Sequence, residues 1–245
     1  MLNIDEIEKR TVNFYSCFCG MDLTKARLGI QYVCSPQRDH ILKGYGSRYT
    51  IFILKKDRTC IISYSPSYQS YFGKMDRSLD IRESIASIGS TFPLQASQLM
   101  IFKKECVFDY KDAKMLMRED FPLYESFFKK ANPSVIQLDW LKEYFDNKAN
   151  KGMLFGYYVN GELASVCDAP DMPYMEGLIQ HTGVMTLPEY RRKGYGKCCA
   201  AMAAHHCLET SVVPQWECDA ENKASMELAK KIGYECFAEA YYYEE

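Results

Sequence analysis

This sequence has no long apolar run, no large net charge and no low-complexity segment. No apolar run reaches the ~20 residues that a membrane-spanning helix requires, so no membrane association is expected. The formal net charge is −2 and the pI is near 6.1, which gives no overall nucleic-acid signature, so any basic patch must be local. The acidic start of the chain also lacks the charged-then-apolar order of a signal peptide. We therefore expect a cytoplasmic protein that binds neither membranes nor nucleic acid.

Cysteine, by contrast, is plentiful. The 11 cysteines are scattered from Cys17 to Cys236 without a pairing rhythm. Because no signal peptide is evident, reduced thiols are expected rather than disulfides. Neighbouring ligand types such as Cys198-Cys199 and His205-His206-Cys207 would point about 100° apart on a helix and would not converge on one ion. No metal site is therefore expected.

The length of 245 residues is comfortable for two domains. We place the boundary at residue 110, which gives an N-terminal α/β domain at 1–110 and a second domain at 111–245. In the first domain, periodicity predicts helices at 1–18 and 81–88, strands at 49–54, 59–64 and 99–108, and an irregular segment at 25–46. In the second, it predicts helices at 119–131, 135–147, 194–209 and 222–232, and strands at 153–159, 163–167, 178–186, 212–218 and 237–243. The predicted hairpin at 49–64 resembles the one at 153–167, so the first domain could be a distant structural relative of the second.

A basic, glycine-bearing loop joins the predicted strand at 178–186 to the predicted helix at 194–209. Its sequence, residues 191–197, is Arg-Arg-Lys-Gly-Tyr-Gly-Lys. The start of a helix leaves backbone amides unpaired, and glycines let another group approach the backbone closely, so this arrangement predicts an anion site. The arginines and lysines indicate that the anion is phosphate. A nucleotide-triphosphate loop is disfavoured, since Lys197 is followed by Cys198 rather than Ser or Thr. A solvated basic turn is the remaining alternative.

This loop and a second motif resemble the GNAT superfamily of N-acetyltransferases. The first motif is Arg191-x-x-Gly194-x-Gly196, at a strand-to-helix turn. The second is Pro214-x-Trp216-x-Cys218, followed by Asn222-x-x-Ser225-x-x-Leu228-Ala229-x-x-Ile232-Gly233-Tyr234. The resemblance covers roughly residues 110–245 and favours the branch that includes antibiotic self-resistance acetyltransferases. It implies a mixed, mostly antiparallel sheet flanked by helices, preceded here by an α/β domain that could itself be a degenerate GNAT-like form.

The resemblance also implies the cofactor and the reaction. Acetyl-CoA would bind with its pyrophosphate at the loop and its pantetheine arm along the strand end before it. An acceptor amine would then attack the thioester directly, through a tetrahedral intermediate and without a covalent acyl-enzyme. The implied cofactor contacts are Val184, Met185, Thr186, Arg191, Arg192, Lys193, Gly194, Tyr195, Gly196, Lys197 and Asn222.

The acid and the base are less well defined, because the sequence departs from the family pattern. Many members place a Tyr acid seven residues after the Asn, where this chain has Ala229. Ser225 is an alternative acid, although it could be only a helix first-turn residue. Relatives often place a Glu or His base where this chain has Gln180, which leaves Glu176, His181 or an ordered water as candidates.

Two functions remain open. The first is an N-acetyltransferase acting on a primary amine of a small molecule, with the aromatic side chains of residues 1–110 as one wall of the substrate pocket. The second is a non-catalytic acyl-CoA-binding or interaction protein with a degenerate site. The chain is expected to be a monomer or a homodimer.

Overall fold

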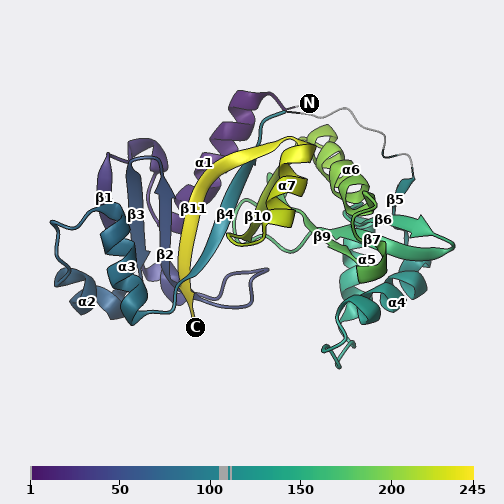
Figure 1. Cartoon of the computed structure of the whole chain (residues 1–245), viewed down its shortest axis with the longest axis horizontal. Helices are drawn as coiled ribbons and strands as arrows, with labels where there is room; N and C mark the ends of the chain where they lie inside the picture. Colours follow the sequence, from purple (N-terminus) through teal and green to yellow (C-terminus); the bar gives the residue numbers. More distant parts are fainter. Residues whose placement is uncertain (1, 105–109, 111) are drawn as a thin grey trace.

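The structure is a computed structural model that describes residues 2–104, 110 and 112–245. Its strands form two β-sheets, and its helices pack around them (Figure 1). The helices are α1 (Ile4–Cys19), α2 (Gln69–Gly73), α3 (Ile81–Thr91), α4 (Phe121–Ala131), α5 (Leu141–Asn150), α6 (Tyr195–Glu209) and α7 (Lys223–Ile232). The strands are β1 (Gly29–Cys34), β2 (Tyr49–Lys56), β3 (Thr59–Tyr64), β4 (Gln95–Phe102), β5 (Ala113–Met115), β6 (Phe155–Val159), β7 (Glu162–Asp168), β8 (Ile179–His181), β9 (Gly183–Thr186), β10 (Val213–Asp219) and β11 (Tyr234–Glu244).

The larger sheet has seven strands in the order β1-β3-β2-β11-β4-β10-β8, and the smaller has four in the order β5-β6-β7-β9. Among the strands of the described residues, the β1–β3 and β10–β8 pairs are parallel. The remaining pairs are antiparallel. The predicted class, a mixed and mostly antiparallel sheet flanked by helices, is therefore confirmed.

Strands from both sides of residue 110 share the larger sheet. β4 lies between β10 and β11 and pairs with both in antiparallel register, while β11 continues on its other edge into β2. In Figure 1 the long yellow β11 runs between the bluish β2 and the teal β4. The division into domains at 1–110 and 111–245 stays a prediction, as does the GNAT-like origin of the first.

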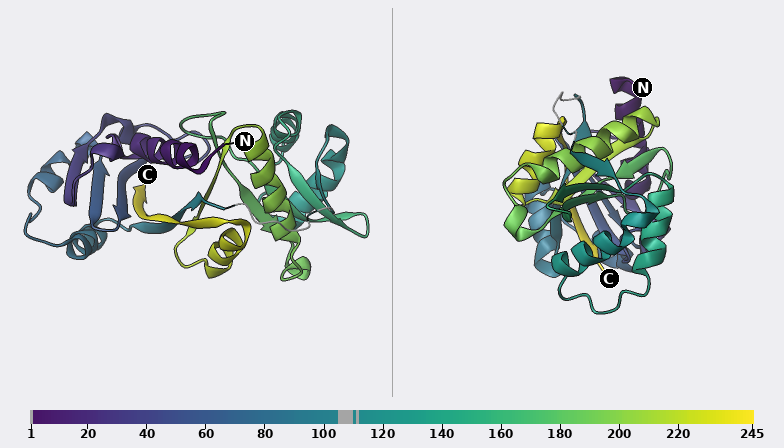
Figure 2. Two further views of the ribbon diagram at one scale, coloured as in Figure 1. Left: turned by 90° about the horizontal axis from the view of Figure 1, so that it is seen from above. Right: turned by 90° about the vertical axis from the view of Figure 1, so that its right-hand side faces the viewer.

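Helices cover both faces of the sheets (Figure 2). α1 packs against β10, β8 and the strands of the N-terminal half, and its buried Phe14, Tyr15 and Phe18 form the contact. α6 and α7 pack on the opposite face of β10, where the Trp216 indole nitrogen donates to the Ser225 hydroxyl at 3.1 Å. α4 packs against β7, on the same side of the molecule as α1.

Local capping residues explain where several helices begin and end. The Asn3 carboxamide oxygen accepts from the Glu6 amide at 2.8 Å, and Gly20 ends α1 in the left-handed conformation. Asn222 caps α7 in the same way, with its oxygen 3.0 Å from the Ser225 amide, and Gly233 ends that helix with a φ of 120°. These two caps of α7 are the ones that the sequence predicts.

Three predictions of local structure need correction. The segment 25–46 contains β1, which pairs with β3, a strand that is distant in sequence. The helix predicted at 135–147 begins at Leu141, so Ile136 is not part of its apolar stripe and is 91% exposed. The strand predicted at 178–186 is divided at Thr182 into β8 and β9. The end of the strand predicted at 99–108 lies outside the described residues.

Two further properties bear on the site. Among the helices of the described residues, none has the length and apolar character to span a bilayer. In residues 2–104, 110 and 112–245, no three His, Cys, Asp or Glu side chains gather as a metal site would require.

Candidate active site

The two sheets separate where β8 gives way to β9. β8 pairs in parallel with β10, and the last bond between them runs from the Thr182 amide to the Gln215 carbonyl oxygen, at 3.2 Å. From Gly183 onward the chain pairs only with β7, as the edge strand of the smaller sheet. An edge strand presents peptide groups that are free to pair with an added extended chain. Val184, Met185 and Thr186, the predicted pantetheine contacts, form this edge.

The loop after β9 leads into the N-terminus of α6. Gly194 is the N-cap with a φ of 89°, and no side chain caps the helix. Arg192, two residues earlier, also has a left-handed φ of 63°. Left-handed residues in such a turn direct backbone amides to one side, and the helix start adds its own unpaired amides and dipole. A Cβ at Gly194 would have no atom within 4 Å, so the space beside it is open to a ligand.

The second glycine, Gly196, lies against β9. A Cβ at Gly196 would lie 2.9 Å from the Thr186 hydroxyl oxygen and 3.5 Å from a methyl carbon of Val184. Gly196 therefore faces β9 and allows α6 to pack closely against that strand. The open space expected beside both glycines is found beside Gly194, and the cofactor contact of Gly196 stays a prediction.

Three side chains at the loop and the helix start contact other residues of the protein. The Arg191 Nε donates to the Thr186 carbonyl oxygen at 3.1 Å, which ties the loop to the end of β9. The Lys193 ammonium lies 5.3 Å from the centroid of the Tyr190 ring. The Tyr195 ring stacks on Tyr157 of β6, with centroids 4.3 Å apart. Arg191, Arg192 and Lys193 are exposed, and Lys197 is half-buried on the first turn of α6.

On α7, Ser225 and Asn222 lie beside the end of β10. The Asn222 side chain is used as a helix cap. Ser225 accepts a hydrogen bond from Trp216, which leaves its own O–H available to donate. Burial raises the pKa of the neighbouring Cys218 thiol, and the Ser225 hydroxyl opposes that shift as a donor to sulfur. A hydroxyl in this place can therefore stabilise a thiolate.

The two predicted bases are poorly suited to that role. Glu176 is exposed, and its carboxylate accepts from the Lys43 ammonium at 2.7 Å, which lowers its pKa below the ordinary value. His181 lies in β8 opposite Gln215, and burial lowers its pKa to about 4. Both groups are therefore weak proton acceptors near neutral pH. The side-chain amide nitrogen of Gln180 donates to the carbonyl oxygen of Pro170 at 2.7 Å, and an amide group does not act as a base.

Glu217, which the sequence does not indicate, is placed better. It is the second residue after Gln215 on β10, just past the point where the sheets separate. Burial raises its pKa to about 7, although hydrogen bonds from Ser97 and Tyr45 oppose the rise. The Tyr45 hydroxyl lies 3.4 Å from a carboxylate oxygen. A carboxyl that titrates near neutral pH is the type of group that general-base catalysis needs.

Asp168, at the end of β7, is the second acidic residue that the sequence does not indicate. It is opposite Gly183 in the register of β7 and β9, and a Cβ on that glycine would lie 2.7 Å from one of its carboxylate oxygens. Burial raises its pKa, while a hydrogen bond from Tyr144 at 3.1 Å opposes the rise. Asp168, on β7 of the smaller sheet, and Glu217, on β10 of the larger sheet, thus lie on either side of the point where the two sheets separate.

The aromatic residues of the first half that the sequence assigns to the pocket wall divide into two groups. Tyr45 contacts Glu217, and Tyr49 stacks on Tyr242 with centroids 4.3 Å apart. Tyr64, Tyr68, Tyr71 and Phe72 instead pack in a separate cluster with α3. Only the first group lies near the point of separation.

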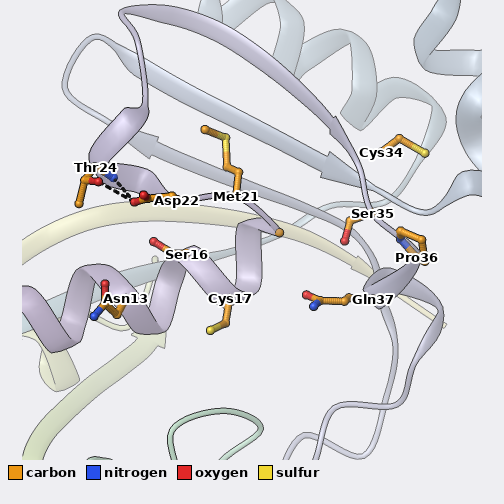
Figure 3. Close-up of a pocket in the computed structure, with 11 residues that line it drawn as sticks. Asn13, Ser16, Cys17, Met21, Asp22, Thr24, Cys34, Ser35, Pro36 and Gln37 are labelled. Atoms are coloured by element: carbon orange, nitrogen blue, oxygen red, sulfur yellow. Dashed lines mark hydrogen bonds between the residues drawn. The ribbon is translucent and has the colours of Figure 1, made fainter.

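A larger cavity of about 720 Å³ lies at the far end of α1 (Figure 3). Its one carboxylate, Asp22, accepts from the amide and the hydroxyl of Thr24 at 3.0 and 2.6 Å, so it stabilises a local turn. Cys17 and Cys34 also line the cavity, and their side chains point away from each other in Figure 3. This cavity offers no set of converging reactive groups.

Comparison with known proteins identifies the class of protein that has these separated sheets and this open helix start. A family model described as GNAT acetyltransferase matches residues 116–243. The chain belongs to this family, which confirms the resemblance drawn from the two motifs.

Solved structures share the fold. An acetyltransferase from the GNAT family of Colwellia psychrerythraea superposes with a TM-score of 0.56 at 11% identity, over 100% of this chain and 98% of that one. A GNAT-family protein of Novosphingobium aromaticivorans DSM 12444 gives a TM-score of 0.50 at 18% identity, over 62% of this chain and 64% of that one. At these identities the likeness concerns the fold alone.

Among curated proteins, the uncharacterized N-acetyltransferase YdfB of Bacillus subtilis (strain 168) is 31% identical over 91 residues. These residues make up 37% of this chain and 34% of YdfB. The match thus spans about a third of the length of that relative.

Proposed function

We propose that this protein is an acetyl-CoA-dependent N-acetyltransferase that acetylates a primary amine of a small molecule. The observation that carries the proposal is the free edge of β9, which diverges from β10 and ends beside the uncapped start of α6. Acetyl-CoA supplies an activated acetyl group as a thioester. The protein supplies amides for its phosphates, a strand edge for its extended arm and acidic groups at the point where the sheets separate.

The residues that we propose to hold the phosphates surround Gly194. The α6 amides and the loop amides donate hydrogen bonds, and Arg191, Arg192, Lys193 and Lys197 contribute positive charge. Gly194 leaves space that any side chain would reduce. The edge of Val184 to Thr186 pairs with the arm, and Tyr195 keeps α6 against β6 through its stacking on Tyr157.

We assign the proton transfers to Glu217 and Ser225. The amine enters as an ammonium ion with three nitrogen protons, and Glu217 accepts one of them and passes it to water. The neutral nitrogen then attacks the acetyl carbon to form a tetrahedral intermediate, which collapses as the carbon–sulfur bond breaks. The second nitrogen proton goes to the released sulfur, and the third stays on the amide nitrogen. The single hydroxyl proton of Ser225, which is donated to the Cys218 sulfur, turns to the leaving thiolate when the carbon–sulfur bond breaks. The products are an amide and the free thiol.

The proposal is tested by measuring acetyl-CoA binding calorimetrically to the wild type and to Gly194→Asp. The added carboxylate fills and charges the phosphate site, so binding should weaken by at least about 100-fold. Gly161→Asp is the matched control, because Gly161 has a similar φ of 81° and equally empty surroundings in the β6–β7 turn. Both variants carry the same backbone strain, and only the first should lose binding. If Gly194→Asp binds acetyl-CoA as tightly as the wild type, the assignment of this loop to the cofactor is refuted.

The alternative is a non-catalytic acyl-CoA-binding protein, which the absence of a Tyr at position 229 favours. The two functions differ in turnover. Thiol release from acetyl-CoA in the presence of a panel of amines supports the enzyme, and binding without release from any amine class supports the alternative.

A further inference from the structure

A second cavity, which we call the α4 cavity, lies between α4 and the strands β7 and β9. It has a volume of about 180 Å³. Its wall is made of the rings of Tyr124, Phe127 and Phe128 from α4 and the side chain of Met185 from β9, and Asp168 lies at its end. Met185 and Asp168 therefore connect this cavity to the diverging edge of β9.

Asp168 is the only carboxylate among the residues that line the α4 cavity. Its nearest donor is the neutral hydroxyl of Tyr144, at 3.1 Å. The neighbouring Lys148 is almost fully buried, but its ammonium binds Asp171 at 2.7 Å. Burial raises the pKa of Asp168, and the charge of Lys148, which lowers that pKa, has the smaller effect. A partly buried carboxylate whose neighbouring cation is bound to another carboxylate is a costly arrangement that a cationic ligand would relieve.

The direction of the Asp168 side chain is fixed by the aromatic residues around it. Tyr144 lies 5.5 Å from the Lys148 ammonium and packs edge-on against Trp140, with ring centroids 5.8 Å apart. Trp140 in turn packs against Phe128, with centroids 5.6 Å apart. These contacts hold the Tyr144 hydroxyl against one carboxylate oxygen and leave the other beside Gly183.

We infer that the acceptor is a small, apolar monoamine, whose ammonium group binds Asp168 and whose alkyl or aryl body lies in the α4 cavity. The inference rests on the proposed function, since it names the second substrate of the same site. The volume corresponds to about six waters at ~30 Å³ each, and it is below the ~300 Å³ of pockets for drug-sized ligands. A cavity with aromatic walls and one carboxylate suits one positive charge on an apolar body, rather than a polycation or an aminoglycoside.

The first experiment compares acceptors on the wild-type protein. Initial rates of thiol release from acetyl-CoA are measured with phenethylamine, hexylamine, spermidine and an aminoglycoside, and acetyl-CoA binding is measured separately by calorimetry. We expect kcat/KM for phenethylamine or hexylamine to exceed that for the polycations by at least about 10-fold. Bound acetyl-CoA with a preference for the polycations, or with no turnover of the apolar amines, would overturn the inference but leave cofactor binding intact. A failure of acetyl-CoA to bind would remove the proposed function, and the inference with it.

The second experiment tests Asp168 itself. In Asp168→Asn, kcat/KM for the apolar amine should fall by about 10- to 100-fold, the effect of losing a hydrogen bond to a charged group. The dissociation constant for acetyl-CoA should not change, because Asp168 is not part of the phosphate site. Asp146→Asn is the control: its carboxylate is on α5 and binds Lys142 on the surface. Unchanged amine kinetics in Asp168→Asn would refute the role of this carboxylate.

A third variant covers the case in which Asp168→Asn does not fold. Tyr144→Phe removes the hydroxyl that orients the Asp168 carboxylate and keeps the ring that packs against Trp140. We expect a rise in KM for the amine of about 3- to 10-fold, because the carboxylate that binds the amine is no longer held in one orientation. An unchanged KM would count against the orientation of Asp168 as the basis of amine binding.

Discussion

Replacing Glu217 by Gln tests whether this carboxyl is as strongly perturbed as its surroundings indicate. Burial raises its pKa from 4.5 to about 7. The raised pKa means that the folded protein favours the neutral carboxylic acid. The contribution of Glu217 to stability is therefore fully present below pH 4.5 and is lost progressively as the pH rises to about 7.

The size of the effect follows from the shift. Each pKa unit corresponds to ~1.36 kcal/mol, so a shift of about 2.5 units makes the folded state less stable by roughly 3 kcal/mol above pH 7 than below pH 4.5. Glutamine is neutral at every pH and has nearly the same shape. The stability of Glu217→Gln relative to the wild type should therefore increase with pH over this window.

The measurement is urea denaturation of both proteins at pH 4.5, 5.5, 6.5, 7.5 and 8.5, values chosen around the two pKa limits. The difference in the free energy of unfolding should change by roughly 3 kcal/mol across the series and level off above pH 7.5. The titratable groups that interact with Glu217 are the Cys218 thiol and the phenols of Tyr15, Tyr45, Tyr49 and Tyr242, and the pKa of each is raised above its ordinary value. Ser97 adds a hydroxyl, and none of these groups titrates in the window. A flat difference across the series would show that Glu217 is not perturbed and would refute its assignment as the base.

Three further predictions concern the same site. In steady-state assays, kcat/KM of the wild type should rise with pH through an apparent pKa near 7, and Glu217→Gln should lose this rise and about 100-fold or more of the rate. Gly196→Ala should destabilise the protein by about 1–3 kcal/mol in urea denaturation, because its Cβ would crowd the Thr186 hydroxyl at 2.9 Å; the cost should shrink in a Thr186→Ala background, and an equal cost in both would contradict this contact. Asn222→Ala should cost about 1 kcal/mol of stability through the loss of the α7 cap, and Asn222→Ser should restore most of it.

The parts of the fold with strong local signals could be predicted from the sequence. The Asn160-Gly161 turn has left-handed φ values of 51° and 81° at the two residues, as a two-residue hairpin requires, and it joins β6 to β7 as expected. Helix α7 begins after Asn222 and ends at Gly233. The loop before α6 could also be recognised, because its glycines and basic residues are adjacent in the chain.

The remaining features depend on contacts between distant residues. β1 is a strand because it pairs with β3, and residues 25–46 carry no strand pattern of their own. The break at Thr182 arises because the chain changes partner from β10 to β7. Glu217 contacts Tyr45, which is 172 residues away, and a single glutamate in a predicted strand gives no sign of such an environment.

The same limit applies to Asp168. Its carboxylate is oriented by Tyr144, 24 residues earlier, and lines a cavity with rings from α4. In the sequence it is one aspartate at the end of a hairpin strand. The family pattern along the chain places a base near residues 176–181, whereas the carboxyls that flank the separated sheets come from β7 and β10.

The position of β4 has a consequence for how the chain acquires its fold during synthesis. β4 ends at Phe102, but the two strands that pair with it, β10 and β11, are completed only at Asp219 and Glu244. At the usual ~5–20 residues per second, a ribosome needs about 7 to 28 s to make the ~140 residues between the ends of β4 and β11. During this time β4 has one row of amides and carbonyls on each side without its native partner, a state that is prone to intermolecular pairing. The region matched by the family model, residues 116–243, omits β4, so the unit recognised by sequence is smaller than the unit that must assemble.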